Sequence, residues 1–409
     1  MLRKVYRHVT RRRVLYVALA AVIVLSAVVA VLHGGGMGGA GKRVPSASPG
    51  PPSPHVSMVA SATPLNPTTP ITVTTADGLL TTVRLTNTGT GVVVTGAFTE
   101  DHRGWRSTQY LGYGGTYRLI AEATNHAGGH AQRQAMITTI RPVRQVYANL
   151  IPGPALVAGK GIGVGQPIVF QFTEPVINKA AVVERLRVTS DPQQPGAWYW
   201  IDDQDVHYRP EQFWEPGTTL NVSAVVYGLD LGGGVYGAEN NSATYRVHDS
   251  WIAKADGASE QLQVFDNEQL IKTMPMSLGA PGFPTHEGIH VISDKQPSII
   301  MDSCTYGVCR GQPGYYREKV AWDERISNDG EFVHSAPWSV GQQGNSNVSH
   351  GCVNLAPANA RWFYDHFGLG DVVETVNSGG RPLPVWDLYG DWALPWSQWQ
   401  AGIGSAAHS

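Results

Sequence analysis

The stretch Leu79-Leu-Thr-Thr-Val-Arg-Leu-Thr-Asn87, followed by Gly91-Val-Val-Val-Thr-Gly-Ala-Phe98, is made of short runs in which apolar and polar residues alternate. Turn-forming residues recur at intervals of about 8–12 residues through the surrounding segment. Alternation with a period of two indicates half-buried strands, and regularly spaced short strands indicate an antiparallel sandwich. The sequence therefore predicts a mainly β protein, with a first sandwich at 73–145.

A second block of the same kind follows at 146–249, with strands expected at Ile168–Phe172, Ala197–Trp200 and Thr219–Tyr227. The block also contains four glycines at alternate positions, namely Gly159, Gly161, Gly163 and Gly165. Their spacing fits neither G-x-G-x-x-G nor G-x-x-x-x-G-K, so we expect turns rather than a phosphate-binding loop.

Upstream of the sandwiches, the basic segment 1–13 precedes an apolar run from Val14 to Leu32. As a helix, this run would span about 28 Å, close to the thickness of one hydrocarbon core. Because basic flanks stay cytoplasmic, we expect a transmembrane anchor at 14–32 with the rest of the chain outside the cell membrane. A cleaved signal peptide is the alternative, although its apolar region is usually shorter. Segment 33–72, rich in Gly, Pro, Ser and Thr, is expected to be an extended linker.

Composition excludes several classes of protein. The chain has 409 residues, enough for more than one domain, and only 15% of them are charged. Lys and Arg number 30 against 32 Asp and Glu, so no basic excess is available to neutralise the phosphates of a nucleic acid. Three cysteines cannot support a disulfide-rich scaffold, and one must stay unpaired if the other two bond.

The sequence changes character again from Trp251 onward. Two strand-like runs flank Asn267-Glu268 and predict a hairpin, and further strands are expected at His290–Ser293, Ser298–Met301 and Glu331–His334. One helix is predicted from about Pro357 to His366, with Pro in its first turn and Gly368 just after its end. The tail 379–409 is rich in tryptophan, for which we favour packing over contact with glycans; the four residues are Trp386, Trp392, Trp396 and Trp399.

One candidate site is His286-Glu287-Gly288-Ile289-His290, which matches H-E-x-x-H. In zinc proteases this spacing works because a helix places both imidazoles on one face. Here prolines precede the segment, Gly288 lies inside it and a strand-like run follows. We therefore expect a loop that enters a strand, where the two histidines do not converge as they do on a helix.

The other candidate is Ser349-His350-Gly351-Cys352-Val353-Asn354, with His334-Ser335 upstream at the end of a strand. A thiol nucleophile needs a base and a group that orients the base, and these residues can supply both. Consecutive N–H groups at Gly351 and Cys352 could form an oxyanion hole. A buried structural cysteine beside two ordinary histidines is the alternative that spacing alone leaves open.

The two segments together resemble the signature of the L,D-transpeptidases of bacterial cell walls. That signature is a His, a spacer, Ser or Thr, His-Gly-Cys, one apolar residue and Asn, and each fixed position is met here. The resemblance extends over about 250–378. The order of segments resembles the anchored members, and implies two immunoglobulin-like β-sandwich domains followed by a β-rich catalytic domain with few helices.

The resemblance implies a role for each matching residue. Cys352 would attack a tetrapeptide stem at the carbonyl that precedes its terminal D-Ala, and His334 would move the proton. The Ser335 carbonyl would orient the imidazole. The N–H groups of Gly351 and Cys352, with the Tyr316 region, would hold the oxyanion. His350 and Asn354 would shape the loop, whereas the stem-peptide pocket would be lined by Met301, Tyr306 and Trp338.

A second stem's amine would then attack the thioester, which gives a 3→3 cross-link without any cofactor or metal. The resemblance also implies that carbapenem β-lactams acylate Cys352. Water, a D-amino acid or a lipoprotein amine remain possible acceptors. A non-catalytic peptidoglycan-binding scaffold is the alternative from another class, and the zinc protease is the third reading.

Two features depart from the family pattern. Cys304 and Cys309 lie in the expected lid over the site, where an oxidising compartment favours a bond between them. Such a bond would leave Cys352 as the reactive thiol and would restrict the lid. His290 stands where the family pattern has an aromatic residue, and the sequence gives no account of it.

Overall fold

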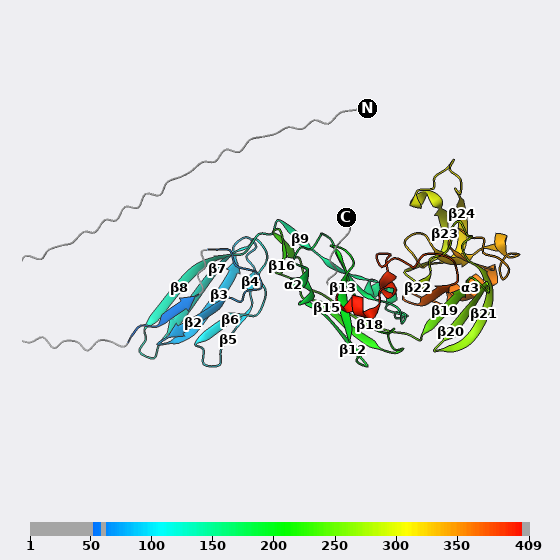
Figure 1. Ribbon diagram of the computed structural model, residues 1–409. Coiled ribbons are helices and arrows are strands. Elements are labelled where there is room, and N and C mark those ends of the chain that lie inside the picture. The colour runs from blue at the N-terminus through cyan, green and yellow to red at the C-terminus, as the bar shows by residue number, and fades with distance from the viewer. Residues whose placement is uncertain (1–51, 59–62, 403–409) are drawn as a thin grey trace, which may run out of the picture. The chain divides into compact units, whose positions relative to one another are not determined.

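The computed structural model describes residues 52–58 and 63–402 (Figure 1). The fold is mostly β, with 45% of residues in strands and 10% in helices, as the alternating runs predicted. The predicted cytoplasmic segment 1–13, the anchor 14–32 and most of the linker 33–72 lie outside the described residues. The described end of that expected linker is part of the first sandwich instead, because His55–Met58 pairs with the strand that begins at Thr72, and Val56 and Ile71 are buried in its core. Among the described residues, no helix has the length and apolar character needed to cross a membrane.

The first sandwich consists of two four-stranded sheets. One sheet has the order β1 (His55–Met58), β2 (Thr72–Ala76), β6 (Gly104–Ser107) and β5 (Gly96–Phe98). The other has the order β4 (Val93–Val94), β3 (Leu79–Asn87), β7 (Thr116–Thr124) and β8 (His130–Thr138). Val73 and Trp105 from the first sheet share a core with Leu85 and Leu119 from the second. The stretch of alternating residues thus contributes β3 and β4 to one sheet and β5 to the facing sheet.

The second sandwich is built in the same way. Its larger sheet has the order β10 (Ala148–Ile151), β11 (Ile168–Phe172), β14 (Asp205–Pro210) and β13 (Gly196–Trp200). Its partner has the order β12 (Leu186–Asp191), β15 (Thr219–Ala224) and β18 (Asn241–Arg246). A small sheet joins β16 (Asp230–Gly232), β17 (Val235–Gly237) and β9 (Arg144–Val146), and two short helices are α1 (Pro154–Val157) and α2 (Lys179–Val183).

Two expectations for this block need refinement. The strand expected to reach Tyr227 ends at Ala224, because the chain turns at Gly228 with a φ of 76°. Gly163 and Gly165 do not form a phosphate loop. Their N–H groups donate to the carbonyls of Leu369 and Gly370 at 2.8 and 3.0 Å. A Cβ at Gly163 would lie 2.2 Å from the backbone of Gly370, so glycine is required for this close approach.

The third part is organised around a nine-stranded sheet. Its order is β22 (Gly288–Val291), β27 (Val372–Val376), β19 (Trp251–Asp256), β20 (Gln261–Asp266), β21 (Gln269–Ser277), β26 (Val353–Leu355), β25 (Phe332–Ser335), β24 (Arg317–Arg325) and β23 (Asp294–Asp302). The predicted hairpin is confirmed as β20–β21, with left-handed φ angles of 45° at Asn267 and 68° at Glu268.

The predicted helix is α3, which runs from Pro357 to His366 and buries Ala360 and Phe363. It packs beside β24 and β25, the strands that carry the lid and the base. A fixed φ at Pro357 suits the first turn of a helix, and the chain leaves the helix at Phe367 in an extended conformation. This helix therefore supports the sheet below the site described next.

Candidate active site

Parallel pairing of β25 with β26 places the two segments of the sequence signature side by side. Val333 pairs with Val353, and His334 pairs with Asn354. Cys352 is the residue immediately before β26, and it lines the same cavity as His334. A parallel pair needs a crossover connection, and residues 336–352 supply it, with the short 3-10 helix Pro337–Ser339 inside.

The turn that carries the thiol is closed by Ser349. Its Oγ donates to the carbonyl of Cys352 at 2.6 Å and accepts the N–H of Gly351 at 3.1 Å. Gly351 has a φ of 112°, in the region that favours glycine. The N–H of Gly351, which was expected in an oxyanion hole, is therefore engaged by Ser349 in this structure.

His334 is held in the tautomer that a general base needs. Its ring is buried, and Nδ1 lies 3.0 Å from the main-chain oxygen of Ser335. A carbonyl oxygen only accepts hydrogen bonds, so Nδ1 carries the hydrogen and Nε2 keeps its lone pair. Burial lowers the pKa of His334 to about 4, although the Ser335 carbonyl acts in the opposite direction. The imidazole is thus neutral at physiological pH.

Cys352 is a buried, unpaired thiol with 4% of its surface exposed. Burial raises its pKa to about 12, with a further contribution from the Glu331 carboxylate. Its Sγ lies 3.7 Å from the carbonyl oxygen of Gly330, to which the S–H can donate. Burial thus favours the neutral form of the thiol as well as that of the imidazole.

The two residues open into one cavity of about 360 Å³. Seven of the residues that line it were singled out from the sequence, namely Met301, Tyr316, His334, Trp338, His350, Cys352 and Asn354. Ser335 lies behind the imidazole, and the side chain of Tyr306 falls outside what the structure describes. The cavity also includes Glu318, Val320, Val348 and Ser349. Sequence reasoning missed Glu318 because an exposed residue in a strand carries no local signal.

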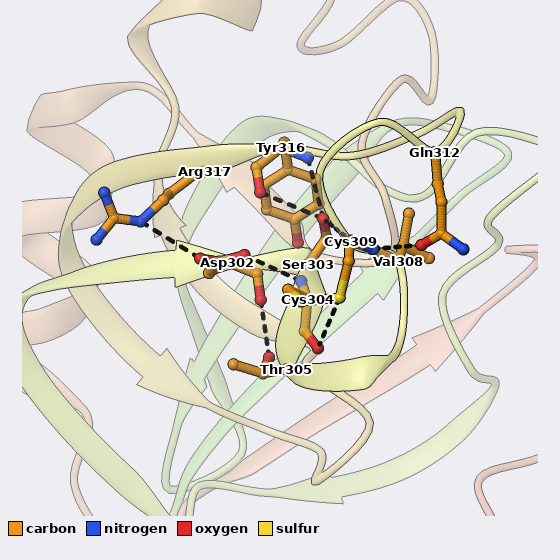
Figure 2. Close-up of a disulfide and its surroundings, with 9 residues drawn as sticks. All are labelled: Asp302, Ser303, Cys304, Thr305, Val308, Cys309, Gln312, Tyr316 and Arg317. Atoms are coloured by element: carbon orange, nitrogen blue, oxygen red, sulfur yellow. Dashed lines mark hydrogen bonds and ion pairs between the residues drawn. A yellow bond between two sulfur atoms is a disulfide. The ribbon is translucent and has the colours of Figure 1, made fainter.

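A lid connects β23 to β24 beside this cavity, and Figure 2 shows its interactions. Cys304 and Cys309 are joined by a disulfide, as the sequence predicted. Ser303 binds the lid internally, because its Oγ donates to the carbonyl of Val308 at 2.8 Å and accepts the N–H of Tyr316 at 3.0 Å. The disulfide therefore closes a loop whose base is already cross-linked by hydrogen bonds.

Three rings stand at the mouth of the cavity. The imidazole of His350 lies 4.9 Å from the ring of Phe283 and 5.1 Å from that of Tyr316, measured between centroids. Tyr316 belongs to the end of the lid, and Phe283 belongs to the loop before β22. His350 thus joins the thiol-bearing turn to both neighbouring segments by ring contacts.

The H-E-x-x-H segment lies in a loop and in β22, not in a helix. Its two histidines nevertheless converge, because both contact the carboxylate of Glu331. His286 Nδ1 lies 3.0 Å from Oε1, and His290 Nε2 lies 3.2 Å from Oε2. Gly288, with a φ of 114°, bends the chain between them. In the described part of the chain, no group of three or more His, Cys, Asp or Glu residues is arranged to hold a metal ion.

Comparison with known proteins agrees with this geometry. The bacterial Ig domain family matches residues 62–230, and the L,D-transpeptidase catalytic domain family matches residues 250–375. L,D-transpeptidase 2 of Mycobacterium tuberculosis is 42% identical over 337 residues, which cover 82% of this chain and 81% of that protein. The chain belongs to the L,D-transpeptidase family. L,D-transpeptidase 5 of the same species is 36% identical to it, over 85% of this chain and 77% of that protein.

A solved L,D-transpeptidase in complex with imipenem is 32% identical to this family member, with a TM-score of 0.49. That alignment covers 57% of this chain and 100% of the other. Family membership confirms the resemblance noted in the signature, and it confirms the order of Ig-like modules before an L,D-transpeptidase catalytic domain.

Proposed function

We propose that this L,D-transpeptidase forms 3→3 cross-links between peptidoglycan stem peptides through a thioester on Cys352. The observation that carries the proposal is the parallel pairing that brings Cys352 and His334 to one cavity, with Nε2 of the imidazole free to accept a proton. A non-catalytic scaffold would not need this arrangement. A zinc protease would need its two histidines free for metal, whereas here both bind Glu331.

In the first step, the sulfur of Cys352 attacks the carbonyl carbon that precedes the terminal D-Ala. His334 Nε2 takes the thiol proton as the C–S bond forms, because a preformed thiolate is disfavoured by the raised pKa of the thiol. Collapse of the tetrahedral adduct breaks the C–N bond, and His334 returns the proton to the departing D-Ala amine. The product is a thioester that retains the energy of the acyl bond.

In the second step, the side-chain amine of another stem attacks the thioester carbonyl. His334 takes a proton from this amine and returns it to the sulfur, so that an amide forms and the thiol is restored. Glu318 lies on the wall of the same cavity, where its carboxylate would attract a cationic acceptor. We expect Met301, Tyr306 and Trp338 to contact the stem peptide, with Asn354 beneath them.

The negative oxygen of each adduct needs donors. We propose the N–H groups of Cys352 and Gly351, with the Tyr316 region beside them. The N–H of Gly351 would have to leave the Oγ of Ser349, which holds it at 3.1 Å in the resting structure. Oxyanion stabilisation of this kind is worth about 10²–10³ in rate for one donor.

We also propose the placement of the enzyme in the cell envelope. Residues 1–13 would be cytoplasmic, 14–32 would anchor the chain in the cell membrane, and the part of segment 33–72 that precedes β1 would act as a linker. The Ig-like modules at 73–145 and 146–249 would set the height of the catalytic domain, 250–378, and of its tail, 379–409. The basic and apolar character of the first two segments supports this assignment.

Intact-mass spectrometry tests the function directly. The full-length chain, in detergent micelles, is incubated with a carbapenem beside a Cys352→Ala control. We expect an adduct of one drug mass that the control lacks, and release of D-Ala from a tetrapeptide stem by the wild type only. Absence of both from reduced, folded wild-type protein would overturn the proposal.

A further inference from the structure

A buried carboxylate lies beneath the thiol-bearing turn and has no role in the steps above. Glu331 is 5% exposed and accepts three hydrogen bonds. Its Oε1 accepts from the main-chain N–H of His286 at 2.8 Å and from Nδ1 of the same residue at 3.0 Å. Its Oε2 accepts from Nε2 of His290 at 3.2 Å. Two imidazoles separated by three residues therefore clamp one carboxylate, and we call these three residues the Glu331 cluster.

The Glu331 cluster lies next to the turn that carries Cys352, as two observations indicate. The Sγ of Cys352 lies 3.7 Å from the carbonyl oxygen of Gly330, the residue that precedes Glu331. A Cβ at Gly351 would lie 3.5 Å from Cγ and 3.6 Å from Oε1 of Glu331. A side chain no larger than a methyl group at position 351 would therefore be in van der Waals contact with the carboxylate, so Glu331 is the next group behind the turn that carries Cys352.

A buried negative charge in this place opposes catalysis unless a cation balances it. An uncompensated carboxylate disfavours both a thiolate and an oxyanion, because like charges repel strongly away from water. After burial itself, Glu331 is among the groups that raise the pKa of Cys352, together with Asp323, while Arg325 acts in the opposite direction. His286 and His290 supply the hydrogen-bond donors that offset the carboxylate, and a proton on His286 adds a positive charge beside it.

We propose that the Glu331 cluster is a positioning and charge-balancing device for Cys352, in which a protonated His286 neutralises Glu331 and loss of that proton slows reaction at the thiol. The inference deepens the proposed function and rests on Cys352 as the nucleophile. It also gives His290 a role, since its fully buried ring holds the second carboxylate oxygen.

The groups around His286 determine the direction in which its pKa is shifted. The hydrogen bond that His286 donates to the Glu331 carboxylate raises the pKa of His286, burial opposes this shift, and the Asp329 and Asp387 carboxylates add to it. Burial works to raise the pKa of Glu331, but the hydrogen bonds of His286 and His290 outweigh it and lower that pKa to about 2. The neighbouring Glu287 is turned away, toward the N–H of Gly379 at 3.1 Å. His286 is partly exposed, so solvent protons reach it.

The test measures how fast Cys352 reacts with iodoacetamide, a small neutral probe, and with a carbapenem, over about pH 5 to pH 9. His286→Gln removes the cation, and Glu331→Gln removes the carboxylate. His207→Gln is the matched control, because His207 forms a similar buried pair with Asp391 at 2.9 Å but lies in β14 of the second sandwich. Melting temperatures are recorded for every variant of the full-length chain.

Rates are compared as ratios at each pH, which removes the ionisation of the thiol itself. We expect the wild type to exceed His286→Gln by about tenfold below the pKa of His286, equivalent to one pKa unit of the thiol, and the ratio to fall toward one above it. The reaction rate of Cys352 in Glu331→Gln, relative to that in the wild type, should increase as pH rises. His207→Gln should match the wild type throughout.

Ratios that do not change with pH, or equal slowing by both cluster variants, would overturn the inference and leave a purely structural cluster. If a cluster variant does not fold, the His286 titration measured by NMR in the Cys352→Ala chain replaces it. The pKa of His286 from that titration must then equal the pH at which the reaction of Cys352 in the wild type slows on the alkaline side. If the ratios of alkylation rates change with pH as expected but no carbapenem adduct forms, only the proposed function is overturned. If a carbapenem adduct forms but the ratios do not change with pH, only the inference is overturned.

Discussion

The imidazole of His334, the proposed general base, is oriented by a main-chain atom rather than by a side chain. His334 Nδ1 donates to the carbonyl of Ser335 at 3.0 Å, and that oxygen is present whatever residue occupies position 335. The orientation of the base thus depends on the backbone of β25, while the chemistry depends on the ring. These two dependences can be separated by substitution.

His334→Gln should slow carbapenem acylation of Cys352 by about 10²–10⁴, the usual contribution of a general base. Ser335→Ala is the matched control, and it should stay within a few-fold of the wild type because only its carbonyl is used. Stopped-flow and intact-mass measurements give both rates. Equal losses in the two variants would show that the hydroxyl, not the carbonyl, orients the ring.

The burial of His334 also makes stability depend on pH. Its pKa is about 4 in the folded chain and about 6.5 in an unfolded one, so between these values only the unfolded chain takes up the proton. The free energy of unfolding should therefore fall as pH drops from about 6.5 to about 4, by up to about 3 kcal/mol from this group. Urea unfolding of the wild type and of His334→Gln measures the contribution, and identical pH slopes would contradict it.

At the level of elements, the lid between β23 and β24 is restrained twice, by its disulfide and by Ser303. Cys304 and Cys309 are only five positions apart in the sequence, so their bond restricts a very short loop. The chain-entropy estimate for closing such a loop is about 2 kcal/mol, less than for a long one. The bond therefore acts mainly on the lid.

Cys304→Ser with Cys309→Ser, made in a Cys352→Ala background, should speed amide hydrogen exchange across residues 303–316. The melting temperature should shift by only a few degrees, because the lid contributes little to the core. The Cys352→Ala chain with its disulfide intact is the control. Unchanged exchange in the lid would mean that Ser303 and its partners hold it without the disulfide.

At the level of the whole described chain, the tryptophan-rich tail packs against the second sandwich. Trp399 is fully buried in α4 (Trp396–Gln400), donates from Nε1 to the carbonyl of Ala197 at 2.9 Å and stacks on Tyr199 with centroids 4.8 Å apart. Arg209 of β14 lies 4.6 Å from the ring of Trp399 and 4.7 Å from that of Trp392. Burial lowers the pKa of this arginine to about 10, and the aromatic faces help to hold its cation.

Trp399→Ala should lower the free energy of unfolding by about 3–5 kcal/mol, since it leaves a large cavity and a cation without its ring. Trp386 belongs to the same tail but is 51% exposed, so Trp386→Ala should change stability by less than about 0.5 kcal/mol. Denaturant unfolding of both variants compares them. Similar losses would show that the tail is held through other contacts.

Local patterns in the sequence determined much of this protein. The alternation in Leu79–Asn87 specified a half-buried strand, and Pro357 with Gly368 bounded α3, because strand period and helix caps are properties of neighbouring residues. The turn around Cys352 could also be recognised from the sequence, because Ser349 and Gly351, which form it, lie within a few positions of Cys352.

Only the tertiary structure decided which distant residues meet. Glu331 contacts His286 and His290, which lie more than forty positions earlier in the sequence. Glu318 lines the cavity because of the register of β24. No short motif therefore marks Glu331 or Glu318. Arg209 lies against tryptophans of the tail for the same reason. Strand register and domain packing are set by the whole chain at once, because each depends on burying all the apolar faces together. The sequence by itself therefore indicated the proposed nucleophile and its proposed base, and the fold decided what surrounds them.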